Sequence, residues 1–244
     1  MKAMIFAAGV GNRLKPITNT KPKALAEING ITLLEITIKR LISSGFNDII
    51  INVHHFADQI INFLYENKNF GASVTISDET EQLLDTGGGL KKAAWFFNDG
   101  KPFLVHNVDI ISNINLNALY QVHCNTPHCI ATLAGKERKA SREFLINADN
   151  ELCGWKNIIT GEIKIVKNKH LFLKPIAFCG IHIISPEIFG YFNTTNIFSI
   201  INTYLHLAAK HTIKLNLFND DFWMDLGTPA NLKKASKLYV QESF

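Results

Sequence analysis

The sequence predicts an α/β fold with a mixed, mainly parallel sheet and helices on both faces. Short apolar runs typical of buried strands alternate with segments whose apolar residues recur at helical spacing. The first run, Lys2–Ala7, leads directly into a glycine turn. Strand–helix–strand order favours parallel neighbours, because each connecting helix returns the chain to the same end of the sheet.

In the first half of the chain, these patterns predict four strands and three helices. The strands are expected at Lys2–Ala7, Asp48–Val53, Ala72–Ser77 and Phe103–His106. The helices are expected at Leu33–Ser44, Ala57–Tyr65 and Leu90–Phe97.

The second half is predicted to contain shorter strands joined by polar turns. These are expected at Cys129–Ala134, Glu143–Ile146, Ile163–Val166 and Phe178–Ile184. Helices are expected after Pro186 and at Ile197–His206 and Pro229–Val240. No linker or internal repeat separates the halves, so we expect one domain over residues 1–244.

Composition and charge exclude several classes of protein. Hydrophobic residues make up 47% of the 244 and charged residues 19%, a balance that excludes long disorder. The net charge of +4 is too small to indicate a nucleic-acid partner. No apolar run reaches the roughly 18 residues of a membrane span, so no membrane association is expected.

The cysteines indicate a cytoplasmic protein with free thiols. None of the four forms a Cys-x-x-Cys pair. The segment Val122–Cys129 contains two His-Cys pairs, but their spacing fits no standard zinc site and Pro127 interrupts them. The end of a helix followed by a turn is the better interpretation of this segment.

The first chemical signal is a glycine loop, in which Gly9 and Gly11 directly follow the first strand. Its backbone N–H groups can surround a phosphate or the edge of a base. Leu14 stands where a dinucleotide-binding turn needs its third glycine, and the Gly-Lys-Ser/Thr of a Walker loop is absent. Four cations follow the glycines: Arg13, Lys15, Lys21 and Lys23. A stiff loop beside fixed cations suits a polyphosphate.

Further motifs spread over almost the whole chain. In order, they are Ala7–Pro16, Lys21–Leu25, Ile51–His55, Leu84–Gly89, Asn107–Asp109, Phe178–Ile181 and Trp223–Pro229. Together they resemble the sugar-1-phosphate nucleotidyltransferases, most closely the N-acetylmuramate-1-phosphate uridylyltransferase branch and next the mannose-1-phosphate guanylyltransferases. The resemblance implies the nucleotide-diphospho-sugar transferase fold, with a Rossmann-like nucleotide-binding half at about residues 1–110 and a sugar-binding half at about 111–244.

The resemblance also implies a reaction in which a nucleoside triphosphate and a sugar 1-phosphate give a nucleotide-sugar and pyrophosphate. The second pKa of a phosphate monoester is near 6, so the attacking oxygen is mostly anionic at pH 7 and needs no general base. The difficulty is to bring two polyanions together. Catalysis should therefore depend on positioning and charge neutralisation.

Roles in this reaction are implied for four charged residues. Arg13 is expected to neutralise the leaving β and γ phosphates. Lys23 is expected to contact the α-phosphate and the incoming sugar phosphate. Asp109 and Asp225 are expected to hold Mg²⁺, because each follows a strand-like segment and the carboxyl ends of strands meet at one edge of a sheet.

Other residues are expected to contact the nucleotide or the sugar. The nucleotide set is Ala7, Ala8, Gly9, Gly11, Asn12, Glu79, Thr86, Gly87, Gly88 and Asn107. Its glycines would let the backbone approach a flat base, and Glu79 would accept a base N–H. The sugar set is Arg142, Asn157 and Gly180.

The substrates and some alternatives stay open. UTP with an N-acetylmuramate- or hexose-type 1-phosphate is expected first, GTP with mannose 1-phosphate second, and CTP with a non-sugar phosphate such as phosphocholine third. Many relatives have Gly and Pro where this chain has Val108 and Ala24. A non-catalytic nucleotide-sugar-binding protein is the alternative of another class. Leu14 and Asn52 disfavour an NAD oxidoreductase. A monomer or small homo-oligomer is expected.

Overall fold

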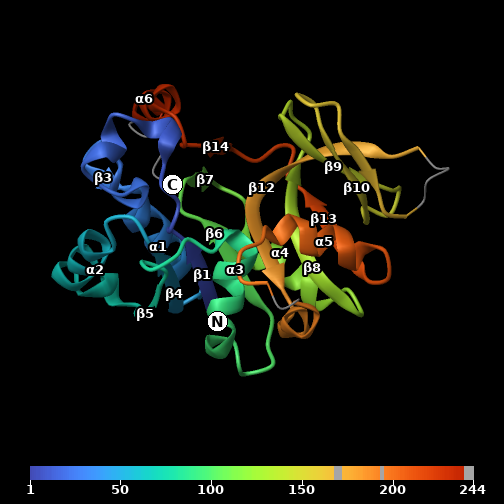
Figure 1. Cartoon of the computed structure of the whole chain (residues 1–244), viewed down its shortest axis with the longest axis horizontal. Coiled ribbons are helices and arrows are strands. Elements are labelled where there is room, and N and C mark those ends of the chain that lie inside the picture. Colours follow the sequence, from blue (N-terminus) through green and yellow to red (C-terminus); the bar gives the residue numbers. More distant parts are fainter. Residues whose placement is uncertain (168–171, 193–194, 239–244) are drawn as a thin grey trace. The chain divides into compact units, whose positions relative to one another are not determined.

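A computed structural model describes residues 1–167, 172–192 and 195–238 of the chain and confirms the mixed α/β fold (Figure 1). The contacts within the chain group it into two compact units. Unit 1 consists of Met1–Leu84, Val105–Ile114 and the segment that begins at Asp221. Unit 2 consists of Asp85–Leu104 and Asn115–Asp220. A single domain with two consecutive halves stays a prediction.

Unit 1 contains the parallel strands that the sequence predicts. β1 (Lys2–Phe6), β4 (Asp48–Val53) and β5 (Ser73–Asp78) pair in parallel. β6 (Phe103–Asn107), of which unit 1 holds the part from Val105, follows β1 on its other side. The strand predicted at Asp48–Val53 is confirmed at both ends, because its isoleucines are buried on both faces of the sheet.

The described residues of unit 1 also form three α-helices and two small antiparallel ribbons. The helices are α1 (Leu33–Ser43), α2 (Ala57–Glu66) and α6 (Pro229–Leu238). The last two residues of the helix predicted at Pro229–Val240 lie outside the described residues. One ribbon joins β2 (Glu27–Ile28) to β3 (Ile31–Thr32), and the other joins β7 (Ile110–Ser112) to β14 (Trp223–Asp225). The strand pairing in these two ribbons is not predicted from the sequence.

Unit 2 is built around strands that pair mostly antiparallel. They are β8 (Cys129–Lys136), β9 (Arg142–Ile146), β10 (Leu152–Asn157), β11 (Ile163–Ile165), β12 (Lys174–Ile184) and β13 (Thr212–Leu217). The order is β11-β10-β9-β12-β8-β13, and β13 is parallel to β8. Helices α4 (Leu116–Cys124) and α5 (Ile200–Ala208) pack against these strands. As expected, the first part of Val122–Cys129 is the end of a helix.

The predicted helix Leu90–Phe97 is placed wrongly. The helix α3 covers Asp85–Lys92, and Ala94–Phe96 forms only a short 3-10 turn. The three consecutive glycines of α3 resemble a loop in the sequence. They form part of a helix because its first N–H groups bind the carbonyl of Phe198, as described below.

Each unit has its own core. In unit 1, Met4, Leu34 and Phe46 are fully buried, and in unit 2 Phe144 and Tyr204 are. Among the residues that the structure describes, no helix combines the length and apolar character needed to cross a membrane.

Candidate functional site

The loop after β1 can be formed only with glycine at position 11. Gly11 has φ +71°, and a Cβ placed there would lie 2.8 Å from Cγ2 of Thr18 and 3.1 Å from Cβ of Lys23. Its carbonyl accepts the N–H of Leu14 at 2.8 Å, which closes a 3-10 turn over Asn12–Leu14. Gly9 is exposed and no atom lies near its Cα on the side where a Cβ would project. The loop therefore turns tightly at Gly11 and is open at Gly9.

The first carboxylate–cation pair joins Lys23 to Asp109. Lys23 begins a 3-10 turn, and Asp109 lies between β6 and β7. The Lys23 ammonium pairs with Oδ2 of Asp109, and the two side chains are only 16% and 10% exposed. Removing either partner of so buried a pair would leave an uncompensated charge away from water. Each side chain therefore depends on the other in the folded protein.

The second pair joins Arg13 to Asp225, the last residue of β14. Nη2 of Arg13 lies 3.5 Å from Oδ2 of Asp225, and the N–H of Gly227 donates to Oδ1 at 2.6 Å. A Cβ on Gly227 would lie 2.6 Å from Nη2 of Arg13 and 2.8 Å from Oδ1 of Asp225. The missing Cβ of Gly227 therefore lets the ends of both side chains lie close to its backbone, a role that is not predicted from the sequence.

The backbone segments that carry the two aspartates lie side by side. β7 and β14 pair antiparallel with Asp225 opposite Ile110, and the N–H of Leu226 donates to the carbonyl of Asp109 at 2.8 Å. Unit 1 thus brings together all four of the charged residues predicted from the motifs. Two carboxylates match the oxygen ligands that Mg²⁺ prefers. In the described part of the chain, no group of three or more His, Cys, Asp or Glu residues has the arrangement of a metal site.

A buried polar network lies behind the glycine loop. Oδ1 of Asn52 accepts the N–H groups of Ala7 at 2.7 Å and Ala8 at 3.3 Å, and its Nδ2 donates to Oε1 of Glu79 at 2.8 Å. Oε2 of Glu79 accepts the N–H of Leu84 at 3.2 Å. Glu79, which is 1% exposed, therefore uses both carboxylate oxygens on protein donors rather than presenting them at a surface.

Asn107 stands at the end of β6, next to a buried histidine. Nδ1 of His106 lies 2.8 Å from the Asn107 carbonyl. Burial, with a smaller contribution from the Arg40 guanidinium, lowers the pKa of His106 to about 3. The ring is therefore neutral at pH 7, and its Nδ1–H can donate to that carbonyl.

Asn12, also predicted to contact the nucleotide, is exposed at the start of its 3-10 turn.

The predicted residues Thr86, Gly87 and Gly88 lie in the first turn of α3, in unit 2. The N–H groups of Gly87 and Gly88 donate to the Phe198 carbonyl at 2.8 and 3.2 Å, and Oγ1 of Thr86 accepts the N–H of Ile200 at 3.0 Å. A Cβ on Gly87 would overlap the Phe198 ring. The close approach that this glycine allows is therefore to Phe198.

The three predicted sugar residues also lie in unit 2. Arg142 is exposed in β9 and stands opposite Asn157 of β10 in the register. Oδ1 of Asn157 accepts the N–H groups of Ile159 at 3.0 Å and Thr160 at 3.3 Å, so it stabilises the turn after β10. Gly180 is buried with φ +75°, where the pairing of β12 with β8 shifts register. Arg142 and Asn157 are paired by the sheet, whereas Gly180 belongs to another strand.

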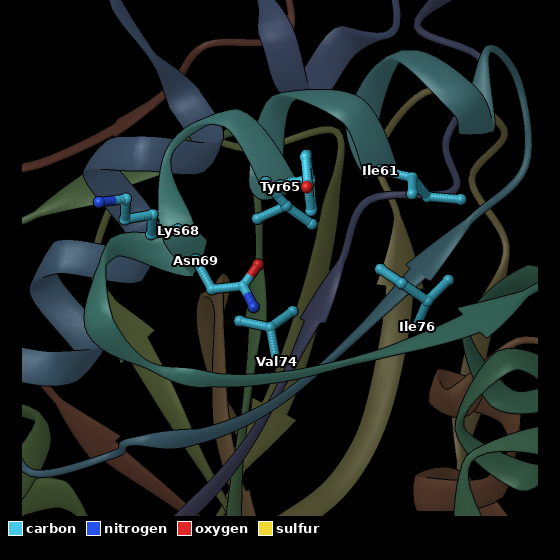
Figure 2. A pocket seen from close by; sticks show the side chains of 7 residues that line it. Ile61, Tyr65, Lys68, Asn69, Val74 and Ile76 are labelled. Carbon is cyan, nitrogen blue, oxygen red and sulfur yellow. The ribbon is translucent and has the colours of Figure 1, made fainter.

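A separate pocket of about 310 Å³ lies between α2 and β5. Ile61, Leu64 and Tyr65 of α2 and Val74 and Ile76 of β5 supply most of its lining (Figure 2). None of the predicted site residues lines it. Lys68 and Asn69 also line it, but the lining as a whole is mostly apolar and does not suit a polyphosphate.

Solved structures similar to this chain show its fold. UDP-glucose pyrophosphorylase from Acinetobacter baumanii has a TM-score of 0.78 at 16% identity, covering 98% of this chain and 92% of that one. HddC from Yersinia pseudotuberculosis, complexed with GMP-PN, has a TM-score of 0.76 at 22% identity, covering 98% and 99%. The chain therefore has the nucleotide-diphospho-sugar transferase fold, as the motifs predict.

Sequence comparisons give the family. The nucleotidyl transferase family matches residues 2–242, and the chain belongs to it. An N-acetylmuramate alpha-1-phosphate uridylyltransferase from Caulobacter vibrioides is 28% identical over 235 residues, covering 93% of this chain and 92% of that protein. One from Neisseria meningitidis is 27% identical, covering 98% of each. Mannose-1-phosphate guanyltransferase 2 from Candida glabrata is 29% identical over 99% of this chain and 65% of its own length.

Proposed function

We propose that this protein transfers a nucleotidyl group from a nucleoside triphosphate to a sugar 1-phosphate and releases pyrophosphate. The observation that carries the proposal is the pair of carboxylate–cation contacts, Lys23 with Asp109 and Arg13 with Asp225, joined through the Leu226 amide. Two cations beside an open glycine loop suit a reaction between two polyanions.

In this proposal the main role of the protein's own side chains is to neutralise phosphate charge, and Arg13 and Lys23 perform it. Arg13, 64% exposed, is free to move toward the leaving β and γ phosphates. Lys23, held near Asp109, contacts the α-phosphate and the incoming sugar phosphate. The two substrates are polyanions that repel each other in water, and the two positive charges reduce that repulsion as the attacking oxygen approaches phosphorus. No side chain needs to remove a proton, because the sugar phosphate is already anionic.

Asp109 and Asp225 are the residues that would hold Mg²⁺. Their carboxylates fit a cation that takes one or two protein oxygens and completes its shell with phosphate and water. When bound, Mg²⁺ would neutralise phosphate charge and orient the triphosphate. The cations that now balance the two carboxylates would then be available to the phosphates.

UTP with N-acetylmuramate 1-phosphate is the proposed substrate pair. Two uridylyltransferases with this activity in their names match the chain along nearly its whole length. GTP with mannose 1-phosphate is second, supported by guanyltransferases that match the chain over a smaller share of their own length. Reaction in the cytoplasm is part of the proposal and is compatible with four free cysteines among the described residues.

A substrate panel tests the function. Pyrophosphate release is measured with each of the four common ribonucleoside triphosphates against N-acetylmuramate, glucose and mannose 1-phosphates and phosphocholine, with and without Mg²⁺. We expect release with UTP and N-acetylmuramate 1-phosphate that requires Mg²⁺. Absence of turnover with every pair, while a triphosphate still binds in calorimetry, would favour a non-catalytic binding protein.

A further inference from the structure

Asn52 holds the first two residues of the glycine loop. It lies in β4 opposite Phe6, the last residue of β1, and is 3% exposed. Its Oδ1 accepts the next two backbone N–H groups, those of Ala7 at 2.7 Å and Ala8 at 3.3 Å. Buried N–H groups need an acceptor, and here a side-chain carbonyl supplies it where the strand ends.

Glu79 fixes the orientation of the Asn52 amide. A carboxylate only accepts hydrogen bonds, so Asn52 must turn its NH₂ group toward Oε1 of Glu79, 2.8 Å away, and its oxygen toward the loop. Glu79 is itself held by its N–H, which donates to the Val53 carbonyl at 2.8 Å, and by the Leu84 N–H on Oε2. The direction of each hydrogen bond in this network is therefore determined.

The network occupies some of the N–H groups of the loop and so limits which of them are open to a ligand. Two successive N–H groups that converge on one oxygen form a small anion-binding concavity, and in this chain the Asn52 carbonyl fills it. The N–H groups of Ala7 and Ala8 are thus occupied, and the part of the loop open to a ligand begins at Gly9, which is exposed.

From this network we infer that Asn52, oriented by Glu79, is a positioning residue that sets the loop conformation in which the nucleotide is bound. The inference rests on the proposed function, because it assigns the loop to the nucleoside triphosphate. It predicts that a disturbed network weakens capture of the triphosphate more than it slows the chemical step, since neither side chain contacts the reacting atoms.

The variant Asn52→Asp tests this role with almost no change of shape. It keeps the acceptor oxygen for the N–H groups of Ala7 and Ala8 but replaces the NH₂ donor with a second oxygen, which places a carboxylate against Glu79 with no proton donor between them. We expect KM for the triphosphate to rise about tenfold or more, as for a buried hydrogen bond lost beside a charge, with kcat and KM for the sugar phosphate changed much less.

The double variant Asn52→Asp with Glu79→Gln should restore the network. The new carboxylate at position 52 would accept the N–H groups of Ala7 and Ala8 and a hydrogen bond from the new side-chain amide at position 79. The oxygen of that amide would accept the N–H of Leu84. We expect KM for the triphosphate to return close to its natural value. A folded double variant whose KM stays as high as that of Asn52→Asp would overturn the inference.

Two further measurements separate positioning from general stability. Oδ1 of Asn147 also accepts two backbone N–H groups, those of Asp149 and Glu151, in the turn after β9. Its Nδ2 donates to Oε2 of Glu151 at 3.3 Å, so Asn147→Asp is the matched control, expected to lower thermal stability without raising KM for the triphosphate. An equal rise in KM for this control would contradict a specific role for Asn52.

Amide hydrogen exchange of Ala7 and Ala8, followed by NMR, reports on the network without catalysis. Exchange should be slow in the natural chain, faster in Asn52→Asp and slow again in the double variant. If this exchange pattern is found in a protein that shows no turnover, the proposed function is contradicted but the hydrogen-bond network is confirmed. If Asn52→Asp shows normal turnover and an unchanged KM for the triphosphate, the positioning role of Asn52 is contradicted and the proposed function is not.

Discussion

The backbone amide of Leu226 donates a hydrogen bond of 2.8 Å to the carbonyl of Asp109. This contact joins β14 to the end of β6 and sets Asp225 beside Asp109, although the two residues are far apart in the sequence. Each carboxylate faces its own cation, Arg13 or Lys23. The proposed chemistry depends on this arrangement of four charges.

Removing either carboxylate should abolish most of the activity. We expect Asp109→Ala and Asp225→Ala each to lower kcat by about 100-fold or more, because they remove proposed Mg²⁺ ligands and leave the facing cation without its partner. Steady-state pyrophosphate release measures this effect. The exposed residue Glu66 at the end of α2 provides the control, and Glu66→Ala should be unchanged. Comparable turnover in all three variants would contradict the site.

Gly227→Ala should disturb the second pair specifically. The new Cβ would lie within 2.8 Å of both Nη2 of Arg13 and Oδ1 of Asp225, and these side-chain ends would have to move apart. We expect a marked loss of kcat/KM with little change in Tm, since Arg13 is largely exposed. Gly190→Ala, at a glycine with open space around its Cα, is the control for Gly-to-Ala replacement. A large drop in Tm in Gly227→Ala would indicate a structural role instead.

Gly87→Ala should reduce stability even without nucleotide. Its Cβ would overlap the Phe198 ring, and overpacking of this kind costs about 1–3 kcal/mol. Urea unfolding measures the loss. In the double variant Gly87→Ala with Phe198→Ala, the ring is absent, so Gly87→Ala should cost less than in the natural chain. If Gly87→Ala raises KM for the triphosphate at unchanged stability, the glycine serves the base and not Phe198.

Stability should fall as the pH drops below about 6.5. Burial, with Arg40, lowers the pKa of His106 to about 3, and burial lowers that of His123 to about 4. The unfolded chain takes up protons near pH 6.5 that the folded chain does not bind until much lower pH. Each group therefore costs up to about 1.4 kcal/mol of unfolding free energy per pH unit in that interval.

Urea unfolding between pH 7.5 and 5 checks this dependence. In His106→Asn, whose amide can still donate to the Asn107 carbonyl, one titrating group is lost, so the decline toward low pH should be shallower. A decline equally steep in His106→Asn and in the natural chain would show that His106 does not titrate as described.

Much of the architecture and the charged site can be predicted from the sequence. The β4 strand is evident because its isoleucines are consecutive. Arg13, Lys23, Asp109 and Asp225 each stand in a motif, and the carboxyl ends of strands bring such residues together. Gly227 lies in the same motif as Asp225, so its place in the site could also have been predicted from the sequence.

Other features depend on contacts that a linear pattern does not contain. Asn52 and Glu79 come from different parts of the chain, and a polar residue in an apolar run shows its role only when its partners are known. β10 contains Gly154, Trp155 and Lys156 and lacks an apolar run, so its strand character comes from its neighbours β9 and β11. The start of α3 is set by the Phe198 carbonyl, which is distant in sequence.

The most direct test of the central claim is ³¹P NMR of the protein mixed with UTP, N-acetylmuramate 1-phosphate and Mg²⁺. We predict that the resonances of UTP and the sugar phosphate decline together, while a nucleotide-sugar diphosphate and pyrophosphate appear in equal amounts. Release of inorganic phosphate in place of pyrophosphate, or an unchanged spectrum here and with every other pair of the substrate panel, would contradict it.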